Sequence, residues 1–239
     1  MKLSLKSRNK LRNKLRGLIQ RCASERLKRY LWNAEFSGGR WDFIYKTPND
    51  CIYPYIEKYA NGGSILDLGC GTGNTSNEIP VTVYADYTGV DISDVAVAKA
   101  IKRSLDNGRS AKNRYLRSDF ATYAPNGQFD LILFRESLYY LPPANVEPTL
   151  ERYSKYLKPG GVIIVRLCDW SGKCRPIVEL IEREYEVVDQ HLADTRAADS
   201  TMVGIIVFQR RSRSRCLPGS ASAEQDGGQS SQHEPSFNA

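Results

Sequence analysis

The first residues whose spacing could bind a ligand lie in one short segment, SILDLGCGTGN, at residues 64–74. Its apolar start predicts a strand that ends near Asp67. Glycine then occupies every second position: Gly69, Gly71 and Gly73. Such a loop lets bare backbone approach a ligand closely. A dinucleotide loop needs the spacing G-x-G-x-x-G, but Asn74 and Ser76 stand where its last glycine would fall. The segment therefore predicts a ligand that lacks a diphosphate.

Two further predicted strands end in side chains that suit a nucleoside. The segment TGVDIS carries Asp91, whose carboxylate could accept hydrogen bonds from both hydroxyls of a ribose. The segment RSDF carries Asp119, which could accept from an exocyclic amine, and Phe120, which could lie on a purine ring. Ligands of open parallel sheets bind beyond the carboxyl ends of the strands. The three strand ends together predict an adenosine pocket, although Asp67 could be a strand-end cap and Asp91 a turn residue.

A fourth predicted strand, in FDLILFRESLYYL, ends in residues that could act on a second substrate. Glu136 could accept a proton, and Tyr139 and Tyr140 could orient an acceptor or favour a cation with their rings. In the alternative interpretation, Glu136 caps the following turn and the tyrosines pack beneath a lid. Both interpretations stay open at this point.

The elements that would position these groups alternate along the chain. Strands are predicted at 64–69, 86–91, 113–118, 129–135, 161–168, 185–191 and 202–209, and helices at 73–79, 93–106, 144–157 and 174–184. Continuous apolar strands such as VIIV are typical of sheets covered on both faces. The pattern predicts an α/β fold with a doubly wound, mostly parallel seven-stranded sheet. The last two strands, joined only by a polar loop, are expected to form an antiparallel pair at the sheet edge.

The two ends of the chain differ from its body. Residues 1–30 hold eleven Lys or Arg and one acid, whereas residues 31–209 carry a formal charge of −4. We expect three regions: residues 1–46, a basic amphipathic helix to about Leu31 with an aromatic connector; residues 47–209, a ligand-binding domain; and residues 210–239, a disordered tail. The connector's aromatic residues are expected to form a lid, or to pack on the core: Trp32, Phe36, Trp41, Phe43 and Tyr45.

Composition excludes several classes of protein. No apolar run approaches the ~20 residues of a membrane-spanning helix, and we expect no secretory signal. The six cysteines form no C-x-x-C pair and are expected to be reduced thiols of a cytoplasmic protein. No set of metal ligands is evident, so no metal is expected. The mildly acidic body argues against a protein whose main surface binds nucleic acid.

These motifs, in this order, resemble those of the class I S-adenosylmethionine-dependent methyltransferases over residues 47–209. ILDLGCGTGN resembles the family's first motif, and YLKPGG resembles the turn before its fifth strand. The resemblance implies that Asp67 and the glycine backbone hold the methionine part of S-adenosylmethionine, Asp91 the ribose, and Asp119 with Phe120 the adenine. The expected cofactor-binding residues are Asp67, Gly69, Gly71, Gly73, Asn74, Asp91, Ile92, Asp119, Phe120 and Arg135, and the expected catalytic residues are Glu136, Tyr139 and Tyr140.

The methyl acceptor stays open between classes. The family's N-P-P-[YF] signature is absent, which with the acidic body favours a small-molecule acceptor over RNA or protein. A macromolecular acceptor held by the basic N-terminal helix is the second hypothesis, and a non-catalytic cofactor-binding protein the third. The basic helix could face the protein's own acidic body, an anionic membrane or nucleic acid. An NAD-dependent oxidoreductase would share the ribose carboxylate but not the phosphate loop.

Overall fold

The computed structural model describes residues 15–45, 47–169, 174–194 and 202–211. Seven strands form one sheet: β1 (Ser64–Leu68), β2 (Asp86–Asp91), β3 (Asn113–Arg117), β4 (Phe129–Arg135), β5 (Leu157–Asp169), β6 (Glu186–Asp194) and β7 (Met202–Gln209). The α-helices with assigned bounds are α2 (Glu25–Ser37), α3 (Tyr53–Ala60), α4 (Asn74–Glu78), α5 (Asp94–Asp106), α6 (Pro143–Ser154) and α7 (Arg175–Glu184). Two short 3₁₀ helices are η1 (Asp42–Ile44) and η2 (Leu138–Tyr140).

The sheet has the order β3-β2-β1-β4-β5-β7-β6. Strands β1 to β5 are mutually parallel, and β7 runs antiparallel to both β5 and β6. The predicted doubly wound, mostly parallel fold is confirmed, with the reversed strand lying one place in from the edge. Strand β5 begins earlier than expected, because Leu157 already pairs with Phe129 on β4. The polar loop expected between the last two strands and the expected tail fall mainly outside the described residues.

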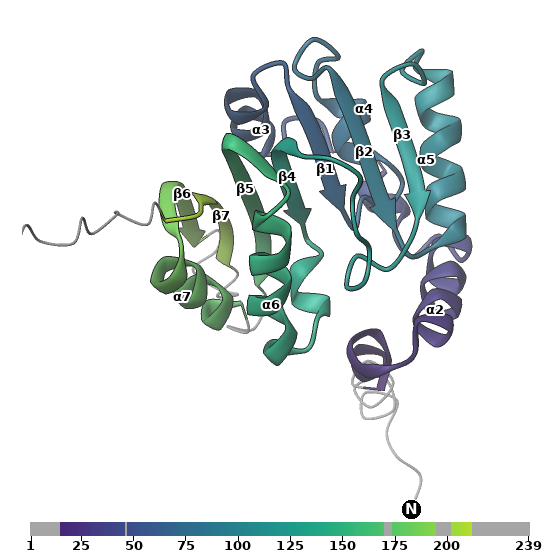
Figure 1. Ribbon diagram of the computed structural model, residues 1–239. Helices are drawn as coiled ribbons and strands as arrows, with labels where there is room; N and C mark the ends of the chain where they lie inside the picture. Colours follow the sequence, from purple (N-terminus) through teal and green to yellow (C-terminus); the bar gives the residue numbers. More distant parts are fainter. Residues whose placement is uncertain (1–14, 46, 170–173, 195–201, 212–239) are drawn as a thin grey trace, which may run out of the picture.

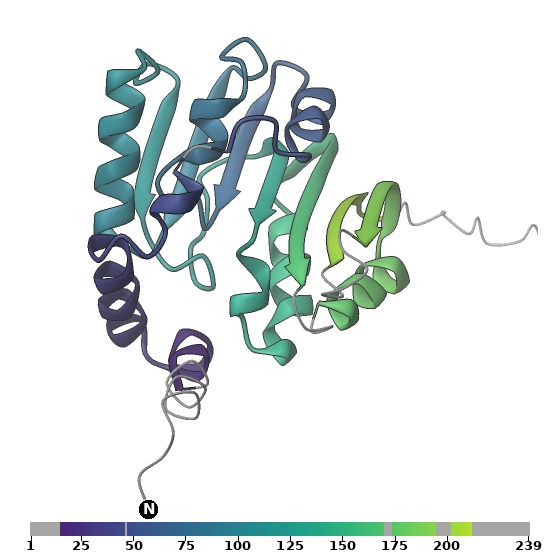
Figure 2. The ribbon, with the colours of Figure 1, turned by 180° about the vertical axis from the view of Figure 1, so that it is seen from behind.

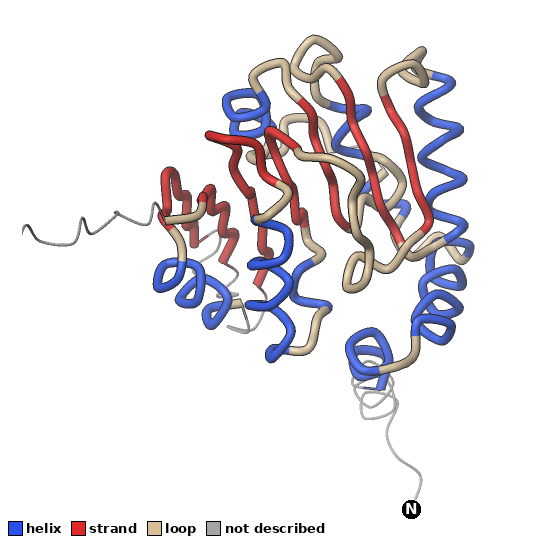
Figure 3. Tube along the Cα trace, viewed as in Figure 1, coloured by secondary structure: helices blue, strands red, loops and turns tan. Residues whose placement is uncertain are grey.

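Helices cover both faces of the sheet, which explains the continuous apolar strands (Figures 1–3). Alternate residues of β1 point to opposite faces. Leu66 belongs to the core beneath α6 and α7, whereas Ile65 belongs to the core beneath α3 and α5. Both side chains are fully buried. The sheet is thus a rigid platform whose parallel strands all end on the same side.

The N-terminal region differs from the single helix expected up to about Leu31. Residues 15–22 are helical, the helix is interrupted at Ala23 and Ser24, and α2 begins at Glu25. Ser24 has an extended backbone, with ψ 154°, which separates the two helices, and it occupies the N-cap position of α2. Helix α2 therefore includes the first residues of the expected aromatic connector and stops before Gly38. In Figure 1, α2 and residues 15–22 lie toward the ends of the parallel strands at which the arrowheads point.

At the opposite ends of the parallel strands, where the strands begin, the carboxylate of Asp130 on β4 joins three strands. Asp130 Oδ2 accepts hydrogen bonds from the backbone N–H and the hydroxyl of Ser64, at 2.6 and 2.8 Å, and from Lys158 Nζ at 2.7 Å. Burial opposes its ionised form, but Lys158 and Ser64 outweigh burial and lower the pKa of Asp130. A Cβ at Gly63 would lie 2.3 Å from this carboxylate, so glycine is required there.

We expect Asp130→Ala to lower the free energy of unfolding by about 1–3 kcal/mol, because the N–H of buried Ser64 loses its acceptor. Urea titration followed by circular dichroism measures the loss. Because the folded-state pKa is lowered, the contribution of Asp130 is present above its unfolded pKa of about 4 and disappears as the pH falls below that value. The control is Asp106→Ala, which removes a solvent-exposed ion pair with Lys102 and should leave the free energy of unfolding essentially unchanged. Equal effects of the two substitutions would contradict this account.

Candidate functional site

A pocket of about 390 Å³ lies where the parallel strands end. Twelve of the thirteen residues expected at the site line it: Asp67, Gly69, Gly71, Asn74, Asp91, Ile92, Asp119, Phe120, Arg135, Glu136, Tyr139 and Tyr140. Gly73 is the exception. It precedes α4 and packs toward Tyr115, where an added Cβ would lie 2.9 Å from the hydroxyl. Four strand ends thus converge on one pocket, as topology requires of a parallel sheet.

The glycine loop is shaped by backbone conformation and by close packing. Gly69 has φ +85°, and a Cβ there would lie 2.5 Å from Cβ of Ser137 on the neighbouring strand end. Gly71 has φ +53°, and its Cβ would point across the pocket toward the ring of Phe36, 3.8 Å away. Side chains are therefore excluded at Gly69 by contact, and at Gly71 by backbone strain and by the space the pocket needs.

Asp67, at the end of β1, is almost fully buried and faces the pocket. Its Oδ2 accepts a hydrogen bond from the Tyr87 hydroxyl on β2. Its Oδ1 is buried and accepts no hydrogen bond of good geometry from the described part of the chain. Burial raises the pKa of Asp67 to about 6, although the Tyr87 hydroxyl favours the ionised form. Asp67 thus offers an unused acceptor to a cationic or hydrogen-bonding ligand group.

Asp91, at the end of β2, holds the glycine loop in place. Its Oδ2 accepts from the Gly71 N–H at 2.9 Å, and its Oδ1 accepts from the Ser93 N–H at 2.8 Å. Burial raises the pKa of Asp91 to about 6, against the effect of both N–H groups. Each carboxylate oxygen has a second lone pair, so two ligand hydroxyls can still be accepted.

Asp119 follows β3 and meets a residue from the N-terminal region. Its Oδ1 accepts from the Ala121 N–H at 2.9 Å, and its Oδ2 lies 3.5 Å from Nζ of Lys28 on α2. Both ends of this ion pair are mostly buried. Helix α2 therefore closes the pocket beside the expected adenine site.

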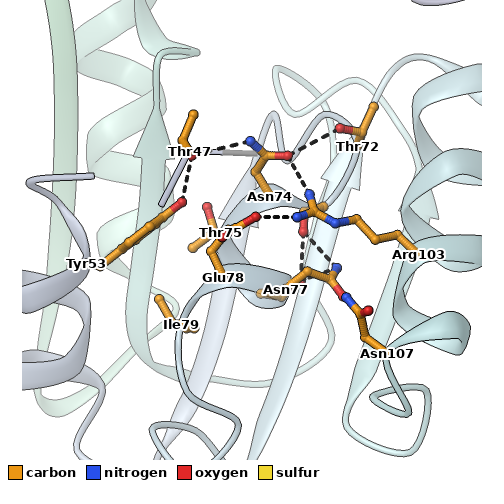
Figure 4. A network of polar contacts seen from close by, with 12 residues as sticks. Thr47, Tyr53, Thr72, Asn74, Thr75, Asn77, Glu78, Ile79, Arg103 and Asn107 are labelled. Carbon is orange, nitrogen blue, oxygen red and sulfur yellow. Dashed lines mark hydrogen bonds and ion pairs between the residues drawn. The ribbon is translucent and has the colours of Figure 1, made fainter. Parts of the chain in front are cut away.

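Asn74 lines the pocket and also links the loop to α5 (Figure 4). Its Oδ1 accepts from Nη1 of Arg103 at 2.7 Å, and its Nδ2 donates to the Thr47 hydroxyl at 3.5 Å. Arg103 also pairs with Glu78 at the end of α4. The network fixes the short helix α4, which begins directly after the glycine loop.

A chain of buried ion pairs forms the side of the pocket below β4 and β5. Asp50 pairs with Arg135 at 2.5 Å and with Arg166 at 3.3 Å, and Arg166 pairs in turn with Glu136. Burial opposes ionisation of Asp50, but the two arginines outweigh burial and lower its pKa. Arg135, expected to bind the cofactor, also donates to the Thr47 hydroxyl at 3.0 Å. The segment before α3 thus anchors the two arginines from behind.

Glu136 is held in a conformation that its residue type disfavours. Its φ of +57° is left-handed, which is costly for a residue with a Cβ. Its Oε2 accepts from the Tyr139 hydroxyl at 2.8 Å and from the Cys168 N–H at 3.1 Å, while Oε1 pairs with Arg166. Burial raises the pKa of Glu136, against the attraction of Arg166. Glu136 lines the pocket, and these three partners fix the position of its carboxylate.

Aromatic rings form one wall of the pocket, and Phe36 in this wall lies close to Gly71 of the glycine loop. Trp32 on α2 packs edge-on against Tyr140 at 4.9 Å, and Tyr140 packs against Tyr139 at 4.8 Å. The other pocket-lining rings of the connector are Phe36, Trp41 and Phe43, whereas Tyr45 does not line the pocket and stacks on Arg103. Buried Glu35 accepts from Trp41 Nε1 at 3.0 Å and from Arg16, which fixes the wall from behind.

Some pocket residues carried no signal in the sequence. Asp50 and Arg166 stand outside any motif, and only the folded chain brings them together. Gln20 and Lys28 belong to what was expected to be an accessory helix, yet both line the pocket. Among the described residues there is no cluster of His, Cys, Asp and Glu suited to a metal ion.

Comparisons with known proteins agree with the motifs. A methyltransferase-domain family model matches residues 65–161. A sterol 24-C-methyltransferase of Gibberella zeae is 30% identical over 42% of this chain and 26% of its own length. A ubiquinone biosynthesis O-methyltransferase of Pseudomonas aeruginosa is 30% identical over 47% of each chain. The chain thus spans less than half the length of either curated relative.

Solved structures share the fold. The N-methyltransferase NodS of Bradyrhizobium japonicum, in complex with S-adenosylhomocysteine, superposes with a TM-score of 0.62 at 16% identity, over 77% of this chain and 98% of that one. Magnesium protoporphyrin IX methyltransferase of Synechocystis, with bound S-adenosylmethionine, gives 0.61 at 15% identity, over 77% and 96%. The family model runs from β1 through the glycine loop to β5, and the sheet has the same fold as these enzymes. Over residues 65–161 the chain is therefore similar to a methyltransferase-domain family, and its sheet shares the fold of these solved methyltransferases.

Proposed function

We propose that the chain binds S-adenosylmethionine in this pocket and catalyses transfer of its methyl group to a small molecule. The observation that carries the proposal is that one pocket is lined by both groups of residues. Asp67, Asp91 and the loop residue Gly71 line it at the ends of β1 and β2, and Glu136 lines it after β4, together with the aromatic wall. When bound, the cofactor supplies an activated methyl group, so the protein must align the acceptor and exclude water.

The residues at the glycine loop fit the cofactor chemically. The unused Oδ1 of Asp67 can accept from an ammonium group, and Asp91 can accept from the two ribose hydroxyls. Gly71 lines the pocket without a side chain, which leaves its backbone accessible to the amino-acid part of the ligand. Asp119 and Phe120 remain the proposed adenine contacts, with Lys28 closing that end. The pocket volume lies within the roughly 300–1,000 Å³ typical of ligand sites.

On the acceptor side, we propose that Glu136 accepts the proton of a protic acceptor. Its carboxylate is oriented by three donors and retains one lone-pair position for a substrate hydrogen. Tyr139 and Tyr140 would orient the acceptor within the aromatic wall. A small-molecule acceptor also agrees with the relatives, which are a sterol 24-C-methyltransferase and a ubiquinone biosynthesis O-methyltransferase.

We expect Asp91→Ala to weaken binding of S-adenosylhomocysteine by at least about tenfold, because charge-assisted hydrogen bonds to the ribose are lost and Gly71 loses its acceptor. Isothermal titration calorimetry measures the affinity. The matched control is Asp86→Ala, at the exposed opposite end of the same strand, which should bind normally. Unchanged affinity in a folded Asp91→Ala protein would contradict the ribose assignment.

We also expect affinity for S-adenosylhomocysteine to depend on pH. Burial raises the pKa values of Asp67 and Asp91 to about 6, and only the ionised carboxylates accept ligand hydrogens with both oxygens. Binding should therefore be full above pH 7 and should weaken as the pH falls through 6. Calorimetry between pH 5 and pH 8 follows the change. A flat profile would show that neither carboxylate is a ligand contact.

We expect Glu136→Gln to reduce kcat by roughly 10²–10⁴-fold while leaving S-adenosylhomocysteine affinity intact. The assay follows transfer of a radiolabelled methyl group from S-adenosylmethionine to a metabolite panel, and then to the acceptor so identified. In the wild type, kcat should fall as the pH decreases toward the raised pKa of Glu136, because a protonated carboxyl accepts no proton. Wild-type kcat in the variant would leave Glu136 with a structural role.

A further inference from the structure

The two N-terminal helices expose apolar side chains that the fold does not bury. Leu15 and Leu18 lie three residues apart on the helix at residues 15–22, and Leu27 and Tyr30 repeat this spacing on α2. These four side chains are between 45% and 73% exposed. Residues three apart share a helix face, so each helix presents an apolar pair to solvent.

The same helices already use their other faces. Gln20 is buried at the pocket, and Arg16 pairs with Glu35. On α2, Lys28, Trp32 and Phe36 line the pocket at the four-residue spacing of one helix face. The exposed leucines and Tyr30 therefore cannot turn inward without dismantling the pocket wall. A helix face that is in contact only with water typically carries polar residues at such positions.

The distribution of charged residues indicates what kind of partner this outward surface binds. Eleven of the first thirty residues are Lys or Arg, and their one acid, Glu25, pairs with Arg117. Arg21 and Arg26 form no ion pair within the described part of the chain. Residues 31–209 carry a charge of −4, so an anionic surface attracts the N-terminal region and repels the body.

We propose that residues 15–30 dock on an anionic membrane surface, with Leu15, Leu18, Leu27 and Tyr30 entering the headgroup region and with Arg21 and Arg26 meeting lipid phosphates. Basic helices with an apolar face bind such interfaces. Nucleic acid is disfavoured because its interfaces are polar, and exposed leucines have no partner on a phosphate backbone. Within the described residues, no helix is long and apolar enough to cross a bilayer, so the proposed contact is a surface contact.

Docking in this way would place the pocket beside the bilayer. Phe43 lines the pocket and is 74% exposed, and Gln20 and Lys28 on the docking helices line it as well. The membrane contact itself does not depend on methyl transfer.

The test is co-sedimentation of the full chain with vesicles of phosphatidylcholine alone, or with 30% phosphatidylserine, at low and high salt. We expect at least roughly tenfold stronger partitioning to the anionic vesicles, and weakening by salt. The variant Leu15→Gln/Leu18→Gln/Leu27→Gln/Tyr30→Gln should lose roughly tenfold or more, because its apolar insertion is removed. The matched control is Ile101→Gln/Leu105→Gln, two exposed apolar residues of α5, which should partition like the wild type.

Circular dichroism and S-adenosylhomocysteine binding report whether each variant is folded. If the quadruple variant misfolds, Leu15→Gln/Leu18→Gln alone, on the helix before α2, decides the matter. No partitioning of the wild type to anionic vesicles overturns the proposal, as does equal partitioning of the wild type and the folded variant. Binding to a single-stranded RNA oligonucleotide in preference to vesicles would also overturn it. Because no readout is enzymatic, these results are separate from the proposed methyl transfer.

Discussion

The shape of the pocket depends on the two hydrogen bonds that the buried carboxylate of Asp91 accepts. One oxygen binds the N–H of Gly71 in the loop after β1, and the other binds the N–H of Ser93, the residue that caps α5. The end of β2, the loop after β1 and the start of α5 are thereby fixed around a single charge, at the carboxyl ends of two adjacent strands. A buried charge is tolerated only when it is well hydrogen-bonded. The N–H groups of the loop and of the helix start therefore stabilise the Asp91 carboxylate, and the carboxylate in turn holds both segments in place.

A second group of charges sets the other half of the pocket. Asp50 lies between Arg135 and Arg166, and Arg166 reaches Glu136. Removing Asp50 would leave Arg135 without its ion-pair partner, and removing Arg166 would leave Glu136 without one, which costs more than the pair contributes. The left-handed backbone at Glu136 is maintained by this surrounding structure. The glycine loop provides open backbone, whereas this side provides charged side chains held rigidly.

The sequence predicted the parts of the site that follow from local pattern. Apolar runs gave the strands, and parallel strands must end together, so Asp67, Asp91 and Glu136 were expected to converge. Asp50 was missed because its partners lie 85 and 116 residues away along the chain. The break at Ser24 was missed because the leucine spacing continues through it, and only the backbone conformation of that residue separates the helices. Local pattern thus predicted elements and strand ends, but not the contacts that the N-terminal region makes across the site.

The ion pair between Lys28 and Asp119 has a consequence for the exchange of cofactor and product. Because α2 supplies one wall of the pocket, a ligand bound there would lie against this helix. Ligand occupancy and the seating of α2 are then thermodynamically reciprocal: whatever holds the helix down tightens binding, and bound ligand holds the helix down by the same factor. A helix that lies before the first strand of the sheet would thereby share, with the loop after β1, in setting how tightly the ligand is held.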